Sequence, residues 1–520
     1  MNSPQVNPAP PRNYPSTNTL GFMADTPKIP TMSIKLKDAT APFVLAMDVG
    51  STASRGGLYD ATGCPVKGSK QRIAHEFTTG HDGRSTIDAD QIADECRRIV
   101  ENIVAFAEDK DLRISGVCFD SFASSFLLVD KQKQALTPCA TYADSRCAPY
   151  VEKLEKRADV GAYHQRTGVR AHTSYHPARF LWVQDQFPEL WEKTWRVMTI
   201  GEYVYLKLAG IEGLATSTGA WSGIVNAHTG ALDTEVLTAC GVPESMIAPL
   251  RLPTEPAYPT GLPWLALESI PWFHGIPDGW PSNVGPGATD ASTIAVAAAT
   301  SGAMRVLLPQ APEHIPEGLW CYRVSSDQVI LGGALNDVGR AISWLERTVV
   351  KLPHEDIEET LAGAPSDHAP EVLPFFSGER ATGWASGAKA SLVGITDDTT
   401  PLGLWRGIIE GIAVSYGRIY DELDEAGAQP ERVIASGRVT TDHPAWLHIL
   451  ADTLRCDVVP LAMKRATLRG TALIALNIIA PGVDRAVPPF GERICPTEAN
   501  AEYYRELRAN FGALYKALVK

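Results

Sequence analysis

A single carboxylate near the start of the chain, Asp48, lies where an apolar run ends and a turn of small polar residues begins. The turn is Gly50-Ser51-Thr52, and Arg55 follows it at the start of a second apolar run. This order is typical of two strands joined by a turn whose amides and hydroxyls can surround a phosphate, with Asp48 placed to hold a metal ion. The Walker A pattern GxxxxGK[ST] is absent. An ordinary polar hairpin explains this segment, taken alone, equally well.

A second segment repeats the arrangement about 250 residues later. An apolar run ends at Ala298, the turn Thr300-Ser301-Gly302 follows, and Arg305 precedes another apolar run. Each segment could therefore open one half of a duplicated protein. Two such hairpins facing each other across a cleft would hold the phosphates of a nucleotide without a P-loop.

Five segments in this order and spacing resemble the FGGY carbohydrate kinases: 48–52, 275–287, 299–303, 374–380 and 435–438. The resemblance extends from residue 43 to about residue 480. It implies an α/β fold of duplicated actin/hexokinase-type (ribonuclease H-like) domains that face each other across a cleft. We expect an N-terminal domain at 43–290 with the sugar site, the first phosphate hairpin and the catalytic base. A C-terminal domain at 291–520 would hold the second phosphate hairpin and the adenosine site.

Composition agrees with an enzyme of this size. A chain of 520 residues is expected to form more than one domain. The first 42 residues carry eight prolines and many Asn, Ser and Thr residues, which predicts a disordered tail. Met23 or Met32 could be the biological start.

Charge and cysteine content indicate which binding partners and which cellular compartment to expect. The net charge of −13 argues against a nucleic-acid-binding protein, and no apolar run is long enough to span a membrane. Nine scattered cysteines form no CxxC pair, so we expect each to be a reduced, buried thiol. We therefore expect a cytoplasmic enzyme with a small-molecule substrate, and a homodimer is an open possibility.

Asp278 is the candidate catalytic base. It lies in the turn Gly275-Ile-Pro-Asp-Gly279 and has the family's spacing to the second hairpin. Transfer of a phosphoryl group to a sugar requires a carboxylate that accepts the proton of the attacking hydroxyl. Asp290 is the rival, and a turn aspartate bonded to its own backbone is the ordinary alternative.

Candidate sugar contacts follow a predicted helix at 88–106 and a predicted buried strand at 112–120. Ligands collect at the carboxyl ends of such strands, and the resemblance places Asp120 and Ser121 at the sugar site. The segment 141–146 is similar to the family's Trp-x-Asp-x-Arg motif. The resemblance makes three of its residues substrate contacts, with Tyr142 in place of the usual Trp: Tyr142, Asp144 and Arg146. A surface ion pair of little energetic value is the alternative for the last two.

The segment 164–179 carries three histidines and three arginines and no acid. A solvated basic loop and a binding site for an anionic substrate both remain open. In the second case Arg170, with Arg146, would bind a substrate carboxylate through its planar guanidinium.

The resemblance also assigns the nucleotide contacts. Phosphates would be held from one side by the first hairpin and from the other side by the second: Ser51, Thr52 and Arg55; Thr300, Ser301 and Gly302. Two glycine turns in the C-terminal half would approach the nucleotide, through Gly333 with Asn336 and through Gly437 with Arg438. The chain departs from the family pattern at Ala299, Arg438 and Arg465, which puts the ATP affinity in question.

Together these features predict a carbohydrate kinase that uses ATP and Mg²⁺, with Asp48 as the metal anchor and Asp278 as the base. The sugar motifs most resemble those of the family's gluconate kinases. A ketose or polyol such as xylulose is the alternative acceptor. A nucleotide-binding sensor or structural protein on the same fold, without kinase activity, is the alternative from another class.

Overall fold

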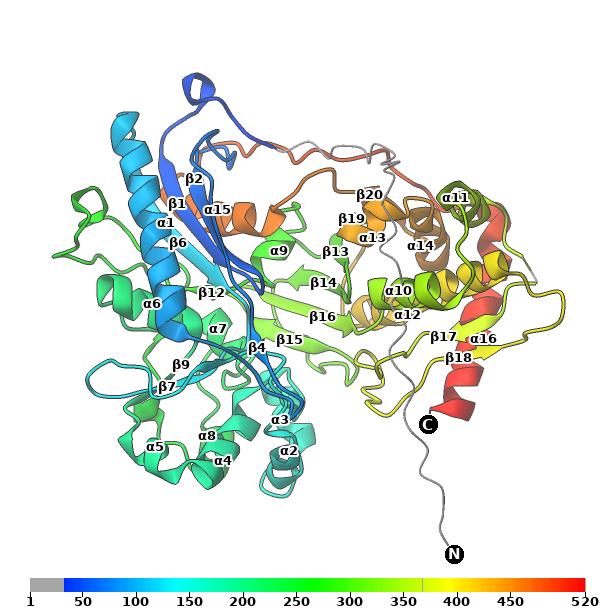
Figure 1. Cartoon of the computed structure of the whole chain (residues 1–520), viewed down its shortest axis with the longest axis horizontal. Helices are drawn as coiled ribbons and strands as arrows, with labels where there is room; N and C mark the ends of the chain where they lie inside the picture. Colours follow the sequence, from blue (N-terminus) through cyan, green and yellow to red (C-terminus); the bar gives the residue numbers. More distant parts are fainter. Residues whose placement is uncertain (1–31, 367, 520) are drawn as a thin grey trace, which may run out of the picture.

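Two mixed β-sheets form the centre of the protein (Figure 1). The computed structural model describes residues 32–366 and 368–519. The first sheet has the order β12-β6-β1-β2-β3, with β1 Phe43–Val49, β2 Ala53–Tyr59, β3 Gln71–Ala74, β6 Ile114–Ser121 and β12 Ile276–Pro277. The second has the order β15-β16-β14-β13-β19-β20, with β13 Thr293–Ala298, β14 Gly302–Leu308, β15 Trp320–Arg323, β16 Val329–Leu335, β19 Arg432–Ser436 and β20 Asp457–Pro460.

The two sheets share one plan, as the repeated hairpin predicted. In the first, β1 pairs with β2 in antiparallel fashion, and β6 and β12 extend the sheet in parallel. In the second, β13 pairs with β14 in antiparallel fashion, and β19 and β20 extend it in parallel. The predicted duplicated α/β fold is confirmed.

Helices from both halves of the chain pack on these sheets or line the cavities. In the first half they are α1 Ala89–Asp109, α3 Val160–Thr167, α4 His176–Gln186, α6 Ile200–Ala209, α7 Thr216–Trp221 and α9 Pro281–Val284. In the second half they are α10 Gly339–Thr348, α11 His354–Ala362, α12 Pro401–Glu425, α13 Arg438–Asp442, α14 Trp446–Leu454, α15 Ala466–Ile479 and α16 Ala501–Leu518.

Helix α1 shows how the sequence determines a local element. The Asp88 carboxylate accepts the backbone N–H groups of Asp90 and Gln91 and so caps the helix. Apolar residues at helical spacing, including Ile99 and Ile103, are buried against the first sheet. Gly56 of β2 permits this close approach, since a Cβ there would lie 2.5 Å from Ile99. The predicted helix at 88–106 and strand at 112–120 both form.

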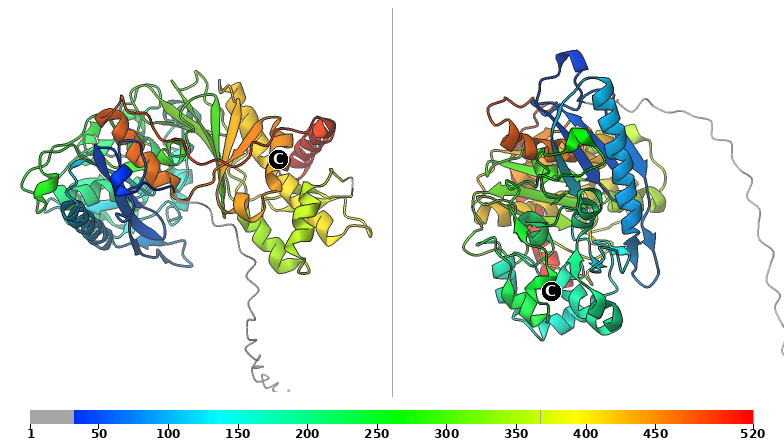
Figure 2. Two further views of the ribbon diagram at one scale, coloured as in Figure 1. Left: turned by 90° about the horizontal axis from the view of Figure 1, so that it is seen from above. Right: turned by 90° about the vertical axis from the view of Figure 1, so that its left-hand side faces the viewer.

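Helix α15 joins the first sheet although it follows the second in sequence. Its residues Leu468, Ala472 and Leu476 share one apolar cluster with Val44 and Ala46 of β1. Figure 2 shows this orange helix beside the blue strands. It contacts α9 so closely that a Cβ at Gly470 would lie 2.0 Å from the carbonyl oxygen of Pro281. The division at residue 290 remains a prediction, and α15 packs across it.

A helical lobe between β6 and β12 receives the edge strand of the second sheet. Trp221 of α7 stacks on Tyr322 of β15 with ring centroids 4.0 Å apart, and Trp320 stacks on Tyr322 at 4.7 Å. The Tyr175 and Tyr322 hydroxyls are 2.7 Å apart and hydrogen-bonded. One apolar cluster therefore spans both halves of the chain.

The prediction of a disordered tail at 1–42 is wrong for residues 32–42, and residues 1–31 lie outside the described residues. Ile34 donates its N–H to the Pro65 carbonyl at 3.0 Å and accepts from the Lys67 N–H at 2.9 Å. Leu36 packs against the core under the first sheet. Backbone pairing with the loop after β2 therefore orders this segment.

All nine cysteines are free thiols, as expected. Eight are buried, but Cys495 is exposed, so the expectation of burial is wrong at that position. Across the described residues, no helix is both long enough and apolar enough to cross a membrane.

The structural role of residues 32–42 can be tested by deletion. A chain that lacks residues 1–42 should unfold at a lower temperature than one that lacks only residues 1–31. The longer deletion removes the Ile34 pairing and the Leu36 contact, together worth about 2 kcal/mol of unfolding free energy, or a few degrees in Tm. Calorimetry of both chains measures the difference. Equal Tm values would contradict the structural role of residues 32–42.

Candidate active site

Three aspartates meet at one edge of the first sheet because β1, β6 and β12 run parallel. In this register Asp48 lies opposite Asp120, and Ile276 lies opposite Asp120 on its other side. Asp278 follows β12 directly and donates its backbone N–H to the Ser121 carbonyl at 2.9 Å. The carboxyl ends of parallel strands thus bring together residues that are far apart in the sequence.

Asp48 is a buried carboxylate with one cationic partner. Its side chain is 10% exposed, and Arg55 Nη1 donates to Oδ2 at 3.0 Å. Burial raises the pKa of Asp48 above the ordinary aspartate value, and the Arg55 charge opposes that shift. The predicted phosphate contact Arg55 is therefore bound to the predicted metal ligand.

Asp120 is fully buried, and Thr471 of α15 donates its hydroxyl to Oδ2. Among the described residues, no hydrogen-bond donor faces Oδ1. Burial, followed by the nearby Asp48 charge, raises the pKa of Asp120 well above its ordinary value. The raised pKa favours the protonated form of Asp120, and a protonated Asp120 can donate a hydrogen bond to the neighbouring Asp48.

Asp278 lines a cavity of about 320 Å³ that also contacts Ser51, Tyr142 and Ser301. Burial, followed by the charge of Asp48, raises the pKa of Asp278 to about 6. The Arg305 charge opposes the rise. A carboxylate with this pKa is ionised at neutral pH and basic enough to accept a proton there.

The two hairpin turns lie in the walls of this same cavity. Ser51 of the first turn and Ser301 of the second both line it, and Thr52 and Thr300 are exposed beside them. The structure therefore brings together the two turns predicted to hold phosphates. Gly302 has a packing reason as well, since a Cβ there would lie 2.1 Å from the Tyr416 hydroxyl.

Several cavity residues were not singled out from the sequence. They are aromatic or cationic side chains from six separate segments: Phe122, Tyr175, Trp221, Trp320, Tyr322, Arg305 and Arg380. Arg380 belongs to a segment that carried the family resemblance, and Arg305 follows the turn of the second hairpin, so these two patterns were the available signal. The aromatic residues come from separate elements that only tertiary packing brings together.

Asp144 and Arg146 bind each other and do not line the cavity. Arg146 Nη2 donates to Asp144 Oδ2 at 2.7 Å, and its Nε donates to Oδ1 at 3.0 Å. The Ser85 N–H also donates to Asp144, and the guanidinium lies 4.7 Å from the Trp182 ring. Of the predicted sugar motif, Tyr142 alone reaches the cavity; it is 46% exposed.

The basic segment 164–179 forms bonds within the protein. Arg166 pairs with Asp233, and the buried Arg179 donates to three backbone carbonyls. Arg170 Nε donates to the Glu317 carbonyl at 2.7 Å and lies outside the cavity lining. His164 Nε2 bonds to the Leu319 carbonyl at 3.0 Å. Many of these cationic side chains therefore form bonds within the helical lobe or between the lobe and the second half of the chain.

The predicted adenosine-site residues separate into two places. Asn336 donates to the carbonyls of Ser377 and Gly378, while Gly333 lies under Ala381, which a Cβ would meet at 2.7 Å. Gly437 has φ +112°, and a Cβ there would lie 2.2 Å from the Ala298 carbonyl oxygen.

Arg438 lines a second and larger cavity, of about 860 Å³, between α10, α11 and α13. Its guanidinium donates to Asp442 at 2.6 Å and is largely exposed. This side chain therefore borders the cavity without filling it.

The fold of two duplicated sheets agrees with the comparisons with known proteins. The sequence models of the N-terminal and C-terminal domains of the FGGY family of carbohydrate kinases match residues 43–258 and 297–477. This protein belongs to the FGGY family of carbohydrate kinases. It is therefore a phosphotransferase that acts on a small sugar, and the family's phosphoryl donor is ATP.

Among its relatives is a gluconokinase of Bacillus licheniformis, 24% identical, with 92% of this chain and 96% of the relative covered. A xylulose kinase of Staphylococcus xylosus is 20% identical, with 91% and 99% covered. The fold is similar to the crystal structure of gluconate kinase from Lactobacillus acidophilus, with a TM-score of 0.84 at 23% identity and 92% and 98% covered.

The paired aspartates allow a sharp test. Asp120→Asn should keep most of the kinase activity, because an amide replaces a protonated carboxyl and can still donate to Asp48. Asp48→Asn should reduce kcat by about a hundredfold or more, since it removes the charged member of the pair. Steady-state assays on both variants, with folding checked by circular dichroism, measure this. Equal losses in the two variants would contradict the neutral state of Asp120.

Proposed function

We propose that this kinase phosphorylates a sugar acid, most specifically gluconate, with ATP and Mg²⁺. The observation that carries the choice of acceptor is the pair Arg305 and Arg380, which line the same cavity as Asp278. Within the described residues, Arg380 Nε is buried without a hydrogen-bond partner. Arg305 makes one long bond, to Ser282 at 3.3 Å. A substrate carboxylate would satisfy such guanidinium groups, whereas a neutral sugar would leave them unpaired.

Of the two arginines, Arg305 is the better candidate for binding a substrate carboxylate beside Asp278. Its charge acts on Asp278, and burial lowers its pKa from the ordinary arginine value, so it is desolvated beside the base. The relatives named gluconokinase support the same acceptor. Arg146 and Arg170 remain the sequence-based candidates for binding the substrate carboxylate. Single substitutions can test this pair separately from Arg305.

In the proposed reaction Asp278 accepts the proton of the attacking hydroxyl. The aromatic rings of the cavity wall exclude water and orient the sugar ring or chain. Ser51 and Ser301 donate hydrogen bonds to phosphate oxygens from opposite walls. Phosphoryl transfer depends mainly on such positioning and on charge stabilisation.

Asp48 fits a magnesium site by the chemistry of its donor, a carboxylate that is held by Arg55 and lies beside the buried Asp120. Magnesium is bound by one or two carboxylates together with water and substrate phosphates. When bound, the ion would neutralise charge on the transferred phosphoryl group. The larger cavity beside Arg438 is proposed for adenosine, with Gly437 allowing close approach.

The expected two-domain division at residue 290, the cytoplasmic location and the homodimer are part of this proposal. Xylulose is the second candidate acceptor, since xylulose kinases are among the relatives and the similar structures.

The raised pKa of Asp278 predicts the pH dependence. Below about pH 6 the carboxyl is protonated and cannot accept a proton, so kcat/KM for the sugar should fall tenfold per pH unit. Asp278→Asn should lose about 10²–10⁴-fold in kcat at pH 8 while it still binds ADP. Asp290→Asn is the matched control, because that exposed residue caps the Ser292 turn. A loss of only a few-fold in Asp278→Asn would place the base elsewhere.

The acceptor proposal is tested by kcat/KM for gluconate and xylulose at pH 8, above the wild-type Asp278 pKa of about 6. Gluconate should be preferred by the wild type. Arg305→Gln should lower its kcat/KM ten- to a hundredfold, as expected for loss of one charge-assisted bond of about 1.5–3 kcal/mol, and should affect xylulose much less.

Arg146→Gln and Arg170→Gln are compared under the same conditions. A change of preference in these two variants, with Arg305→Gln unchanged, would move the carboxylate site to the residues predicted from sequence. A wild-type preference for xylulose would reject the sugar-acid proposal altogether.

A further inference from the structure

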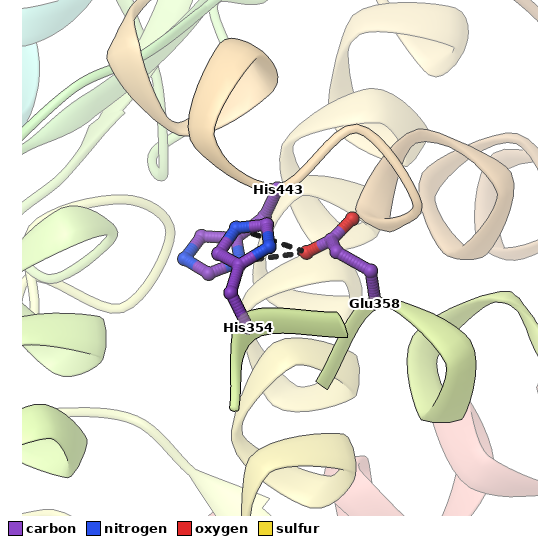
Figure 3. A group of neighbouring side chains, drawn as sticks. All are labelled: His354, Glu358 and His443. Carbon is purple, nitrogen blue, oxygen red and sulfur yellow. Dashed lines mark hydrogen bonds and ion pairs between the residues drawn. The ribbon is translucent and has the colours of Figure 1, made fainter. Parts of the chain in front are cut away.

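Two histidines that line the larger cavity meet one glutamate, away from the aspartates of the first sheet. His354 and Glu358 lie one turn apart on α11, and His443 directly follows α13 as its C-cap. Figure 3 shows both imidazole rings directed to the same carboxylate oxygen of Glu358. The ligand atoms of the three side chains all lie within 4.8 Å of one another.

The distances are close to those that a shared metal ion requires. His443 Nδ1 lies 2.8 Å from Glu358 Oε1, and His354 Nε2 lies 4.0 Å from the same oxygen. Ligand bonds of about 2.0–2.2 Å in a tetrahedral site place neighbouring ligand atoms about 3.3–3.5 Å apart. Shifts of less than about 1 Å would therefore bring these atoms to coordination geometry.

The surroundings hold two of the three ligands in place. The backbone N–H of Ala445 donates to Glu358 Oε2 at 3.0 Å, which leaves Oε1 for the ion. Trp405 packs against the His443 ring at 5.4 Å. His354 is 60% exposed, so its Nε2 is free to exchange its bond to the Asp442 carbonyl, and water can complete the coordination.

We propose that His354, Glu358 and His443 form a zinc site. Two imidazoles and one carboxylate are donors that suit Zn²⁺, whereas Mg²⁺ and Ca²⁺ prefer sites made entirely of oxygen. The site is separate from Asp48 and independent of the proposed acceptor. Its effect is mechanical: the ion connects α11 to the corner between α13 and α14.

The test uses the full-length protein without an affinity tag, stripped by a chelator and then titrated with Zn²⁺ against a chromophoric competitor. We expect one zinc per chain. Co²⁺ in place of zinc should give the visible absorption of a tetrahedral or five-coordinate site. His354→Gln and Glu358→Gln should each weaken zinc binding by more than about a hundredfold, because removing an outer-shell partner alone costs about 10–100-fold.

The variants are chosen to fold. His354 is exposed, and the amide of Glu358→Gln can still accept from Ala445. His448→Gln is the control, because His448 is an exposed histidine on the neighbouring helix α14; its zinc affinity should equal that of the wild type. The proposal is rejected if no stoichiometric zinc binds, if both cluster variants bind zinc like the wild type, or if Asp48→Asn alone abolishes binding.

Discussion

The parallel register of β1, β6 and β12 is the constraint on which the active site depends. It places Asp48, Asp120 and Asp278 at one sheet edge, where the charge of Asp48 raises the pKa of both other carboxyls. Three like charges cannot all be retained in a desolvated site. In this site the pKa of Asp120 is raised well above its ordinary value, Asp48 is paired with Arg55, and Asp278 has a pKa of about 6.

Segments from the second half of the chain complete this edge. Thr471 of α15 supplies the donor to Asp120, and the apolar face of α15 covers β1. Arg305 and Ser301 of β14 and its turn form the opposite wall of the cavity. The stacked rings of Trp221 and Tyr322 connect the two halves near the same place. The site is therefore built jointly by both sheets, and α15 makes the packing of the first sheet depend on the end of the chain.

Positive charge near the cavity has two different uses. In the segment 164–179, guanidinium and imidazole groups bind backbone carbonyls and the Asp233 carboxylate, which stabilises a lobe poor in regular sheet structure. Arg305 and Arg380 have few protein partners among the described residues and line the cavity. A count of charges along the sequence cannot separate these uses, because the difference lies in which acceptors the fold brings near each arginine.

The sequence by itself determined the family, the duplicated fold, the two hairpins that are predicted to hold phosphates and the candidates Asp48 and Asp278, because these rest on short local patterns of strand, turn and polar residue. Helix α1 followed from its cap and its apolar periodicity for the same reason. Tertiary structure decided that Asp144 and Arg146 bind each other, that residues 32–42 pack on the first sheet, and that Arg305, Arg380 and five aromatic rings share one cavity. Those outcomes depend on contacts between residues far apart in the chain, and a hydrogen-bond partner or a desolvated charge is defined only once such contacts form.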